Sequence, residues 1–441
     1  MERRRKNLTQ LFIPICLETL LYMLSGMVDT LMLSSVNDQA VGAVGTVNTY
    51  IGIFIIMFSV ISSGMVAVMT QNIGAGRPGV AYQARQLGLA FNAVLGIILS
   101  LILAFGAGTI LAGVGVADAL MQPAKTYLQI VGGFCILNAL IPICSSYLRA
   151  FGFSKEPLYA SIIGNVINFC LNAFFLFVLH KGVAGVATAT VVSRIINLVI
   201  VVLLGAVLVK AKKHPERESN RDVMGQIIRI GLPSACETAI YNVSMTLVIR
   251  FLNQMDAQGL NVTARSYTMQ ITNFSYCVGA ALAQANAIMT GWRIGAKEYD
   301  ACDRGTRKAA IIGVIVAVIL ETMFALCSGW IMQLFSKDPQ MVSLVGKLLA
   351  IDIVLEMGRV TNLVYGQALK TSGDAVFPVV MGACFMILCS VGGTYLFGIR
   401  LGLLAVGAYI GMAGDECVRA VGMYLRWKSG KWKEKGLVKS R

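Results

Sequence analysis

Long apolar runs are the feature that most constrains this chain, because a bilayer span needs about 20 mostly apolar residues. The sequence contains twelve such runs, at 9–33, 42–73, 83–113, 119–151, 156–179, 182–210, 223–252, 259–293, 303–333, 339–371, 374–397 and 402–427. Only 13% of the residues are charged, whereas a soluble protein has about 25%. We therefore expect an all-α integral membrane protein with twelve transmembrane helices.

Lys and Arg gather in the gaps that follow even-numbered runs and at both termini. The main basic segments are RRRK at 3–6, KAKKHPERESNR at 210–221, WRIGAKEYDACDRGTRK at 292–308 and RWKSGKWKEKGLVKSR at 426–441. The positive-inside rule then predicts cytoplasmic N- and C-termini in a multi-pass protein of the bacterial cytoplasmic (inner) membrane. Because topology explains the net charge of +15, we expect no nucleic-acid partner. The first apolar run is too long for a signal-peptide core, so it is expected to be a retained span.

Cysteine and histidine usage argues against an enzyme. The eleven Cys are scattered without a CxxC pair, and the two His, His180 and His214, lie between apolar runs. Such Cys are expected to be small buried hydrophobes. We predict no catalytic site, no cofactor and no enzymatic activity.

The chain carries an internal repeat. IPICLETLLYMLS at 13–25 aligns with LPSACETAIYNVS at 232–244, and LRAFGFSKEP at 148–157 aligns with LKTSGDAVFP at 369–378. The polar segment 210–222 separates the halves, which predicts two six-helix lobes, 1–209 and 223–427, followed by a basic tail, 428–441. Since six is even, the lobes should share one orientation and be pseudo-symmetric about an axis along the membrane normal, with a central cavity. Within the spans, Pro14, Pro142 and Pro233 are candidate kinks.

Each half begins with a polar stripe on one helical face. The first stripe, at i, i+4, i+7 and i+11, is Glu18, Tyr22, Ser25 and Asp29. The second stripe is Glu237, Tyr241 and Ser244, and it ends at Val248 instead of an acid. A carboxylate at membrane depth costs about 2.5–3.5 kcal/mol or more, so it must be protonated, paired or bound to a cation. The extra carboxylate suggests that ion coupling belongs to the first half.

Amide and hydroxyl side chains follow in the fifth and sixth runs. Asn165, Asn168 and Asn172 share one helical face, and Thr188 and Thr190 follow in GVAGVATAT. With one carboxylate, such oxygens suit a hard monovalent cation, while a carboxylate alone can carry a proton. The alternative is that the amides join neighbouring helices.

The second half has further charges in its tenth and twelfth runs. They are Asp352, Glu356 and Arg359 in the tenth, and Asp415, Glu416 and Arg419 in the twelfth. The spacing predicts Glu–Arg pairs within each helix. We favour a neutralised structural cluster over a role in transport.

Taken in order, several motifs make the chain resemble the multidrug and toxic compound extrusion (MATE) family over its whole length. They are Pro14 with VDT at 28–30, GAG at 74–76, RAFG at 149–152, the Asn165–Asn172 face, GVAGVATAT at 182–190 and GLPSACE at 231–237. The resemblance implies a secondary antiporter in which two six-helix lobes form a V-shaped cavity. It also implies export of small organic, often cationic, compounds in exchange for Na⁺ or H⁺.

The resemblance also implies site residues. The acid of the VDT stretch, here Asp29, is central to cation coupling, and Asn168, Asn172 and Thr190 would complete a Na⁺ or H⁺ site. Some relatives carry an acid where this chain has Asn172. Glu18, Tyr22 and Asn165 would face the cavity from the first lobe, and Glu237, Tyr241, Glu356 and Arg359 would face it from the second.

The tenth run departs from the family pattern. The acid that NorM-type members carry there falls near Arg359, and EMGR at 356–359 and DECVR at 415–419 resemble a less-studied bacterial branch. Two other functions stay open beside a monomeric exporter of small organic substrates in the lipid bilayer. One is a lipid-linked precursor flippase or dedicated metabolite exporter of the same superfamily, and the other is a membrane-embedded enzyme.

Overall fold

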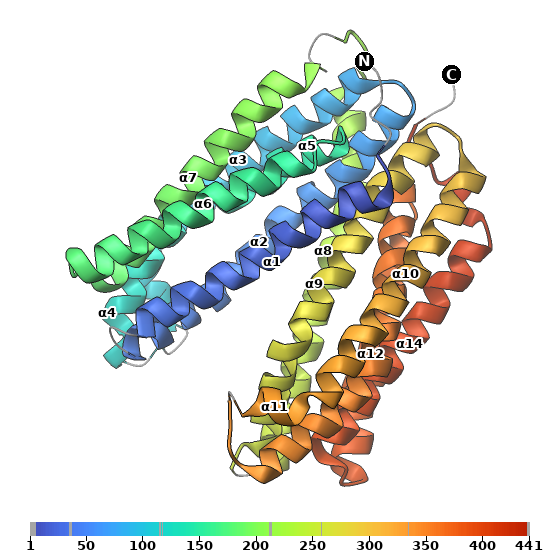
Figure 1. The fold of residues 1–441 in the computed structure, drawn as a ribbon. Helices are drawn as coiled ribbons and strands as arrows, with labels where there is room; N and C mark the ends of the chain where they lie inside the picture. Colours follow the sequence, from blue (N-terminus) through green and yellow to red (C-terminus); the bar gives the residue numbers. More distant parts are fainter. Residues whose placement is uncertain are drawn as a thin grey trace. The chain divides into compact units, whose positions relative to one another are not determined.

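The computed structural model describes residues 6–34, 38–113, 116, 118–210, 214–256, 258–333 and 335–438, and all regular elements in these ranges are helical (Figure 1). The chain divides into two compact units, residues 1–231 and 232–441. We call them the N-lobe and the C-lobe. The segment 210–222, expected to be a linker, belongs to the N-lobe, and the division falls inside a continuous helix, α8.

Six helical segments of the N-lobe coincide with the first six apolar runs. They are α1 (Leu8–Ser34), α2 (Asp38–Gly74), α3 (Pro78–Gly113), α4–η1–α5 (Asp118–Tyr127, Leu128–Gly132, Ile136–Ala150), α6–η2 (Lys155–Ala173, Phe174–Val178) and α7 (Gly182–Leu208). The η elements are π-helical turns, which commonly occur inside longer helices at functional sites. Helix α6 packs between α1 and α7 (Figure 1), so the side chains expected from the first, fifth and sixth spans come from neighbouring helices.

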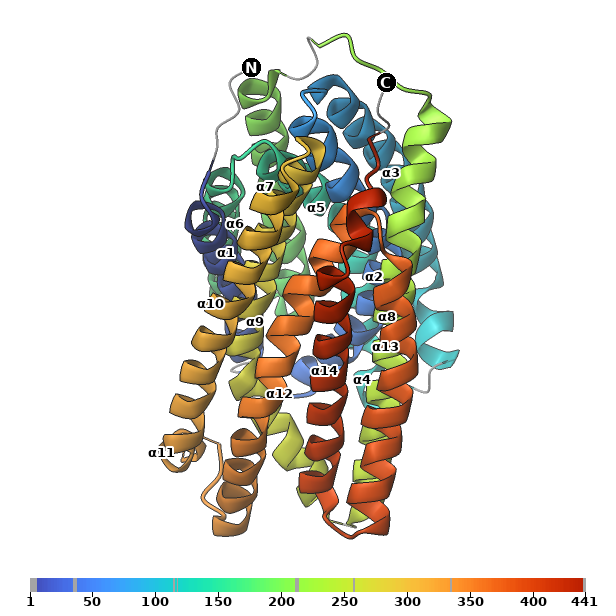
Figure 2. The same ribbon diagram turned by 90° about the vertical axis from the view of Figure 1, so that its right-hand side faces the viewer.

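The remaining helical segments coincide with the last six runs. They are α8 (Asn220–Met255), α9 (Leu260–Gly295), α10–α11 (Tyr299–Leu326, Ser328–Met332), α12 (Pro339–Ser372), α13–η4–η5 (Val376–Phe385, Met386–Val391, Thr394–Arg400) and α14 (Leu404–Lys428). Helix α12 contacts α9, α10 and α14 and lies beside α14 in both views (Figures 1 and 2). It is therefore the central helix of the C-lobe.

Seven helices in the described part of the chain are long and apolar enough to cross a membrane by themselves, or eight if the bent pair α4–α5 counts as one span. Helices α8, α9, α12 and α14 are not among them. Two of these, α12 and α14, carry most of the C-lobe's buried charges, which lowers their hydropathy. These charges lie against neighbouring helices instead of lipid, so the segments remain compatible with a multi-pass membrane protein.

The fourth segment of the N-lobe is bent. The helices 120–132 and 136–150 meet at 42°, and the break lies at residues 133–135, where Cys135 N donates to Gly132 O and Asn138 N donates to Cys135 O. Pro142, a candidate kink, lies inside α5 and therefore beyond this break. The break lies beside two consecutive glycines, Gly132 and Gly133, and glycine weakens a helix because it lacks a side chain.

The tail after α14 is docked on the C-lobe. Trp432 in the 3₁₀-helical turn η6 (Lys431–Glu434) is fully buried and stacks on Trp427 with ring centroids 4.1 Å apart. Its indole Nε1 donates to Trp427 O at 2.9 Å, and Trp427 Nε1 donates to Asp303 Oδ1 of α10 at 2.9 Å. Lys435 Nζ lies 3.6 Å from Asp374 Oδ1. The part of the tail up to residue 438 is thus an ordered brace across α10, α14 and the α12–α13 connection.

Trp432→Ala should lower the apparent unfolding temperature of the purified protein, because truncating a fully buried Trp typically costs about 3–5 kcal/mol. Thermal unfolding in detergent, with trypsin cleavage of the tail as a second readout, measures the effect. Trp330→Ala is the matched control, since Trp330 in α11 is 72% exposed. Equal unfolding temperatures for the two variants would show that the tail does not brace the C-lobe.

Candidate functional site

The N-lobe brings Asp29 together with the asparagines of α6. Asn172 Nδ2 donates to Asp29 Oδ1 at 2.6 Å and also lies 3.2 Å from Asn168 Oδ1. Asp29 is half-buried on α1, whereas Asn168 and Asn172 are buried. Asn172 is the second-last residue of α6, two residues before the π-helical turn η2 begins at Phe174. We call Asp29, Asn168 and Asn172 the Asp29 set.

One oxygen of the Asp29 set has no hydrogen-bond donor. Asn172 Oδ1 is buried, and nothing in the described part of the chain donates to it. A buried acceptor without a donor is unfavourable by about 1–3 kcal/mol. Together with the carboxylate of Asp29, this orphan oxygen forms a place where a proton or a small cation would be stabilised.

Thr190 and Asn165 are not joined to the Asp29 set. The Thr190 hydroxyl is buried and donates to Val186 O within α7, as a hydroxyl in a helix does when no better acceptor is near. Asn165 Nδ2 instead reaches Leu21 O of α1 at 3.5 Å, which is the helix-joining role that the sequence left open. Tyr22, from the same stripe, is 70% exposed.

Glu18 and Glu237 each form an ion pair with a basic residue from a distant helix. Arg149 Nη2 donates to Glu18 Oε2 at 2.6 Å, and Ser161 Oγ lies 3.5 Å from Glu18 Oε1. Lys370 Nζ lies 2.6 Å from Glu237 Oε2. Arg149 and Lys370 hold matching positions in the repeated segments 148–157 and 369–378, so the repeat copies the pair as well as the acid.

Gly382 is packed against the Glu237 pair. A Cβ at this glycine would lie 3.3 Å from Glu237 Cγ. By the register that aligns Pro157 with Pro378, Gly382 takes the place of Ser161. Lys370 therefore compensates the C-lobe acid without the added hydroxyl that assists Glu18.

Two arginines organise the charges of the C-lobe. Arg359 contacts Glu356 Oε2 at 2.8 Å and Glu416 Oε1 at 3.4 Å, and Arg419 contacts Glu416 Oε2 at 3.0 Å. Arg419 also donates to both oxygens of Asp415, at 2.9 and 2.8 Å. The intrahelical pairs predicted from spacing are present, and Glu416 additionally links α14 to α12.

Tyr241 is the fourth residue, with Glu237, Glu356 and Arg359, that we expect to face a cavity from the C-lobe. It interacts electrostatically with Arg359 and with Tyr276 of α9. Glu237 and Glu356, by contrast, are each engaged by a basic residue of the C-lobe. Whether these four residues line a cavity stays a prediction.

Comparison with known proteins assigns the family. The model of the MatE family matches residues 14–174 and again residues 233–396, so its two matches begin at the repeated prolines Pro14 and Pro233.

The chain belongs to the MATE family. The uncharacterized transporter YisQ of Bacillus subtilis (strain 168) is 33% identical over 431 residues, which cover 96% of this chain and 94% of that protein. A probable multidrug resistance protein, NorM of Thermotoga maritima, is 24% identical and covers 98% of this chain and 94% of its own length. A crystal structure of MATE in the straight conformation has a TM-score of 0.88 at 18% identity and covers 97% of this chain and 96% of that chain.

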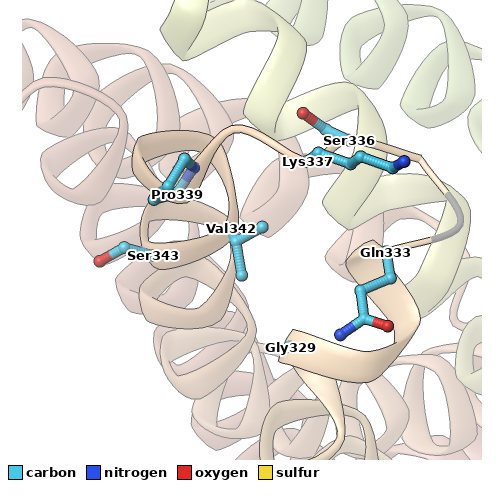
Figure 3. A pocket seen from close by; sticks show the side chains of 7 residues that line it. All are labelled: Gly329, Gln333, Ser336, Lys337, Pro339, Val342 and Ser343. Atoms are coloured by element: carbon cyan, nitrogen blue, oxygen red, sulfur yellow. The ribbon is translucent and has the colours of Figure 1, made fainter.

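The MATE assignment agrees with twelve helical segments in the described chain and identifies the protein as a transporter. A hollow at the start of α12, of about 630 Å³, lies away from the charged residues discussed above. Figure 3 shows that its lining comes from α11, the α11–α12 connection and the first turns of α12. None of the lining residues is acidic: Gly329, Gln333, Ser336, Lys337, Pro339, Val342 and Ser343.

Sequence reasoning missed three polar residues of this MATE protein. The repeat aligns Arg149 with Lys370, but the alignment does not identify them as partners of the repeated acids. Glu321 of α10 is fully buried and was overlooked altogether. The signal for Glu321 was a single acid inside the apolar segment IIGVIVAVILETMFAL at 311–326.

Lys370→Met should destabilise the C-lobe, because removing one partner of a buried ion pair leaves an uncompensated charge, at a cost of about 3–5 kcal/mol when burial is complete. The two side chains retain 13% and 15% exposure, so we expect a smaller loss. Adding Glu237→Gln should restore part of the unfolding temperature. Lys347→Met, at an exposed position of the same helix, is the control. Strictly additive effects of the two changes would mean that the pair does not stabilise the lobe.

Proposed function

We propose that this MATE protein is a secondary active antiporter that exports small organic compounds, of the cationic or multidrug type, in exchange for Na⁺ or H⁺. The single observation that carries the proposal is the Asp29 set. It combines an acid, two amides and an unsatisfied oxygen on two packed helices of the N-lobe. Asp29 is also the stripe acid that the C-lobe replaces with Val248.

The geometry around Asp29 supports coupling to an ion more than a purely structural role. Glu18, Glu237, Glu356 and Asp415 each contact a Lys or Arg directly. Asp29 instead contacts an amide, and Arg194 acts on it only through charge, without an ion-pair contact. An amide donor compensates a carboxylate only partly. Asp29 is therefore better able to exchange its charge state, by taking up a proton or a cation, than an acid already neutralised by a base.

Ion binding at the Asp29 set would favour one arrangement of the N-lobe over another. An ion can shift such an equilibrium only by the difference between its affinities for the two states. Asn172 would respond to the bound ion, because its side-chain amide donates to Asp29 on α1 and its backbone lies two residues before η2. The Thr190 hydroxyl donates its hydrogen to Val186 O and keeps the oxygen lone pairs through which it would bind a cation.

The remaining parts of the proposal rest on sequence and on relatives. Homologous multidrug resistance proteins such as NorM support the substrate class. The distribution of Lys and Arg supports cytoplasmic termini in a bacterial inner membrane. We propose a monomer that needs no cofactor besides its coupling ion.

Transport by proteoliposomes tests the proposal most directly. A Na⁺ gradient and a pH gradient are imposed separately, and movement of a fluorescent organic cation is followed in each case. Transport driven by either gradient identifies the coupling ion. Movement of a labelled lipid-linked precursor, with no gradient-driven movement of the cation, would favour a flippase instead.

Asp29→Asn should abolish gradient-driven transport while leaving expression and unfolding temperature close to those of the unmodified protein, because the amide preserves shape but cannot bind or release a proton at neutral pH. Asp300→Asn is the matched control, since Asp300 is exposed in the first turn of α10. Full gradient-driven transport by Asp29→Asn would refute the assignment.

A further inference from the structure

The C-lobe contains more buried acid than base. Five acids of α10, α12 and α14 are at most 5% exposed: Glu321, Asp352, Glu356, Asp415 and Glu416. Two guanidinium groups, Arg359 and Arg419, contact three of them directly, namely Glu356, Asp415 and Glu416. A further base, Arg265 of α9, is buried, lies against Met245 and interacts with Tyr409. Even with Arg265 counted, acids exceed bases.

Glu321 is the acid for which the structure provides no partner. It is fully buried, and neither carboxyl oxygen has a hydrogen-bond donor in the described part of the chain. Asp352 Oδ2 and Glu356 Oε1 are buried without a partner as well. Four carboxyl oxygens of the cluster are thus buried without a hydrogen-bond donor in the described ranges.

The groups that face Glu321 do not favour its ionised form. Ser275 of α9 interacts with it without reaching hydrogen-bond geometry, and Asp352 and Glu356 of α12 act on it with negative charge. Arg359 is the positive group that also acts on it, but that guanidinium is already held by Glu356 and Glu416.

The other elements around the cluster add titratable groups farther out. Tyr276 of α9 acts on Glu356 and Arg359, and Tyr409 of α14 acts on Asp352. Residues 328–332 of α11, which pack on α10 and α12, contain no titratable side chain. None of these groups offers Glu321 a compensating positive charge.

Since ionising a carboxyl that has neither donor nor counter-charge is very costly in an apolar interior, we propose that Glu321, flanked by the negative charges of Asp352 and Glu356, is a proton-binding site inside the C-lobe, separate from the Asp29 set. Glu321 holds the proton in this conformation. It releases the proton in a conformation that admits water or brings a donor to its carboxyl. The site stands independently of the proposed export, because it follows from the packing of α9, α10 and α12.

A proton fits the site better than a metal ion does. In the described ranges, no three His, Cys, Asp or Glu side chains converge closely enough to hold a metal. The carboxyls of the cluster therefore act on each other through charge without sharing one central ligand. A proton needs only a single carboxyl oxygen.

The repeat indicates that this proton site belongs to one lobe. By the register that aligns Gly74 with Gly295, Glu321 takes the place of Ser100 in α3. The Ser100 hydroxyl accepts a hydrogen bond from Ile136 N at the bend in the fourth segment. The N-lobe thus uses this position to stabilise a helix break, and the C-lobe places an acid there.

Infrared spectroscopy of the full-length protein in lipid nanodiscs tests the proposal, because a protonated carboxyl has a carbonyl band distinct from that of a carboxylate. At neutral pH, growth on carboxyl-¹³C glutamate should shift part of this band, which separates Glu from Asp29 and Asp352. Glu321→Gln should remove most of the glutamate-derived part. Glu434→Gln, at an exposed position, should leave the band unchanged.

Either of two results would overturn the proposal: no glutamate-derived band in the unmodified protein, or an undiminished band in Glu321→Gln. If Glu321→Gln does not fold, Glu321→Met replaces the neutral acid with an apolar chain of similar length and serves for the same spectrum. A second measurement compares unfolding temperatures at neutral and alkaline pH. The unmodified protein should lose more stability at alkaline pH than Glu321→Met does, and equal losses would contradict a proton on Glu321.

Discussion

Compensation of buried charge is the constraint on which this structure depends. A carboxylate within apolar helices persists only if a base, a donor, a cation or a proton offsets its desolvation. Glu18 and Glu237 are offset by Arg149 and Lys370, and Asp29 by an amide. Each solution joins helices that are distant in sequence, so the charges that make the spans costly also determine which helices must pack together.

The same constraint explains the C-lobe's departure from a simple pattern of apolar spans. Helices α12 and α14 carry charges that lower their hydropathy, yet the Arg359–Glu416 contact unites them at a position that neighbouring helices cover. A buried ion network is weak evidence for stability, because desolvation opposes the attraction. Its clearer consequence is register, since Glu416 meets Arg359 only when the two helices align at one depth.

The fold was largely predictable because a membrane span must satisfy its backbone internally and therefore appears as a long apolar run. The Asp29 set was predictable in part, because helical spacing places Asn168 and Asn172 on one face. Spacing within a helix does not reveal the neighbouring helix, so Arg149 and Lys370 went unassigned as partners. The bend at 133–135 was not predicted, because two adjacent glycines in the sequence do not by themselves mark a helix break.

The repeat distinguishes structural acids from functional candidates by a physical argument. Both lobes contain the same charge pair, Glu18–Arg149 in one and Glu237–Lys370 in the other. Because the two lobes share a helical scaffold, the pair is best explained as part of that scaffold. In the alignment of the two halves, Asp29 corresponds to Val248, and Glu321 corresponds to Ser100. An uncompensated acid in only one copy lowers stability without serving the common scaffold, so its presence calls for a role particular to that lobe. Exchange of a proton or cation is such a role, because it requires an acid that the fold leaves incompletely neutralised.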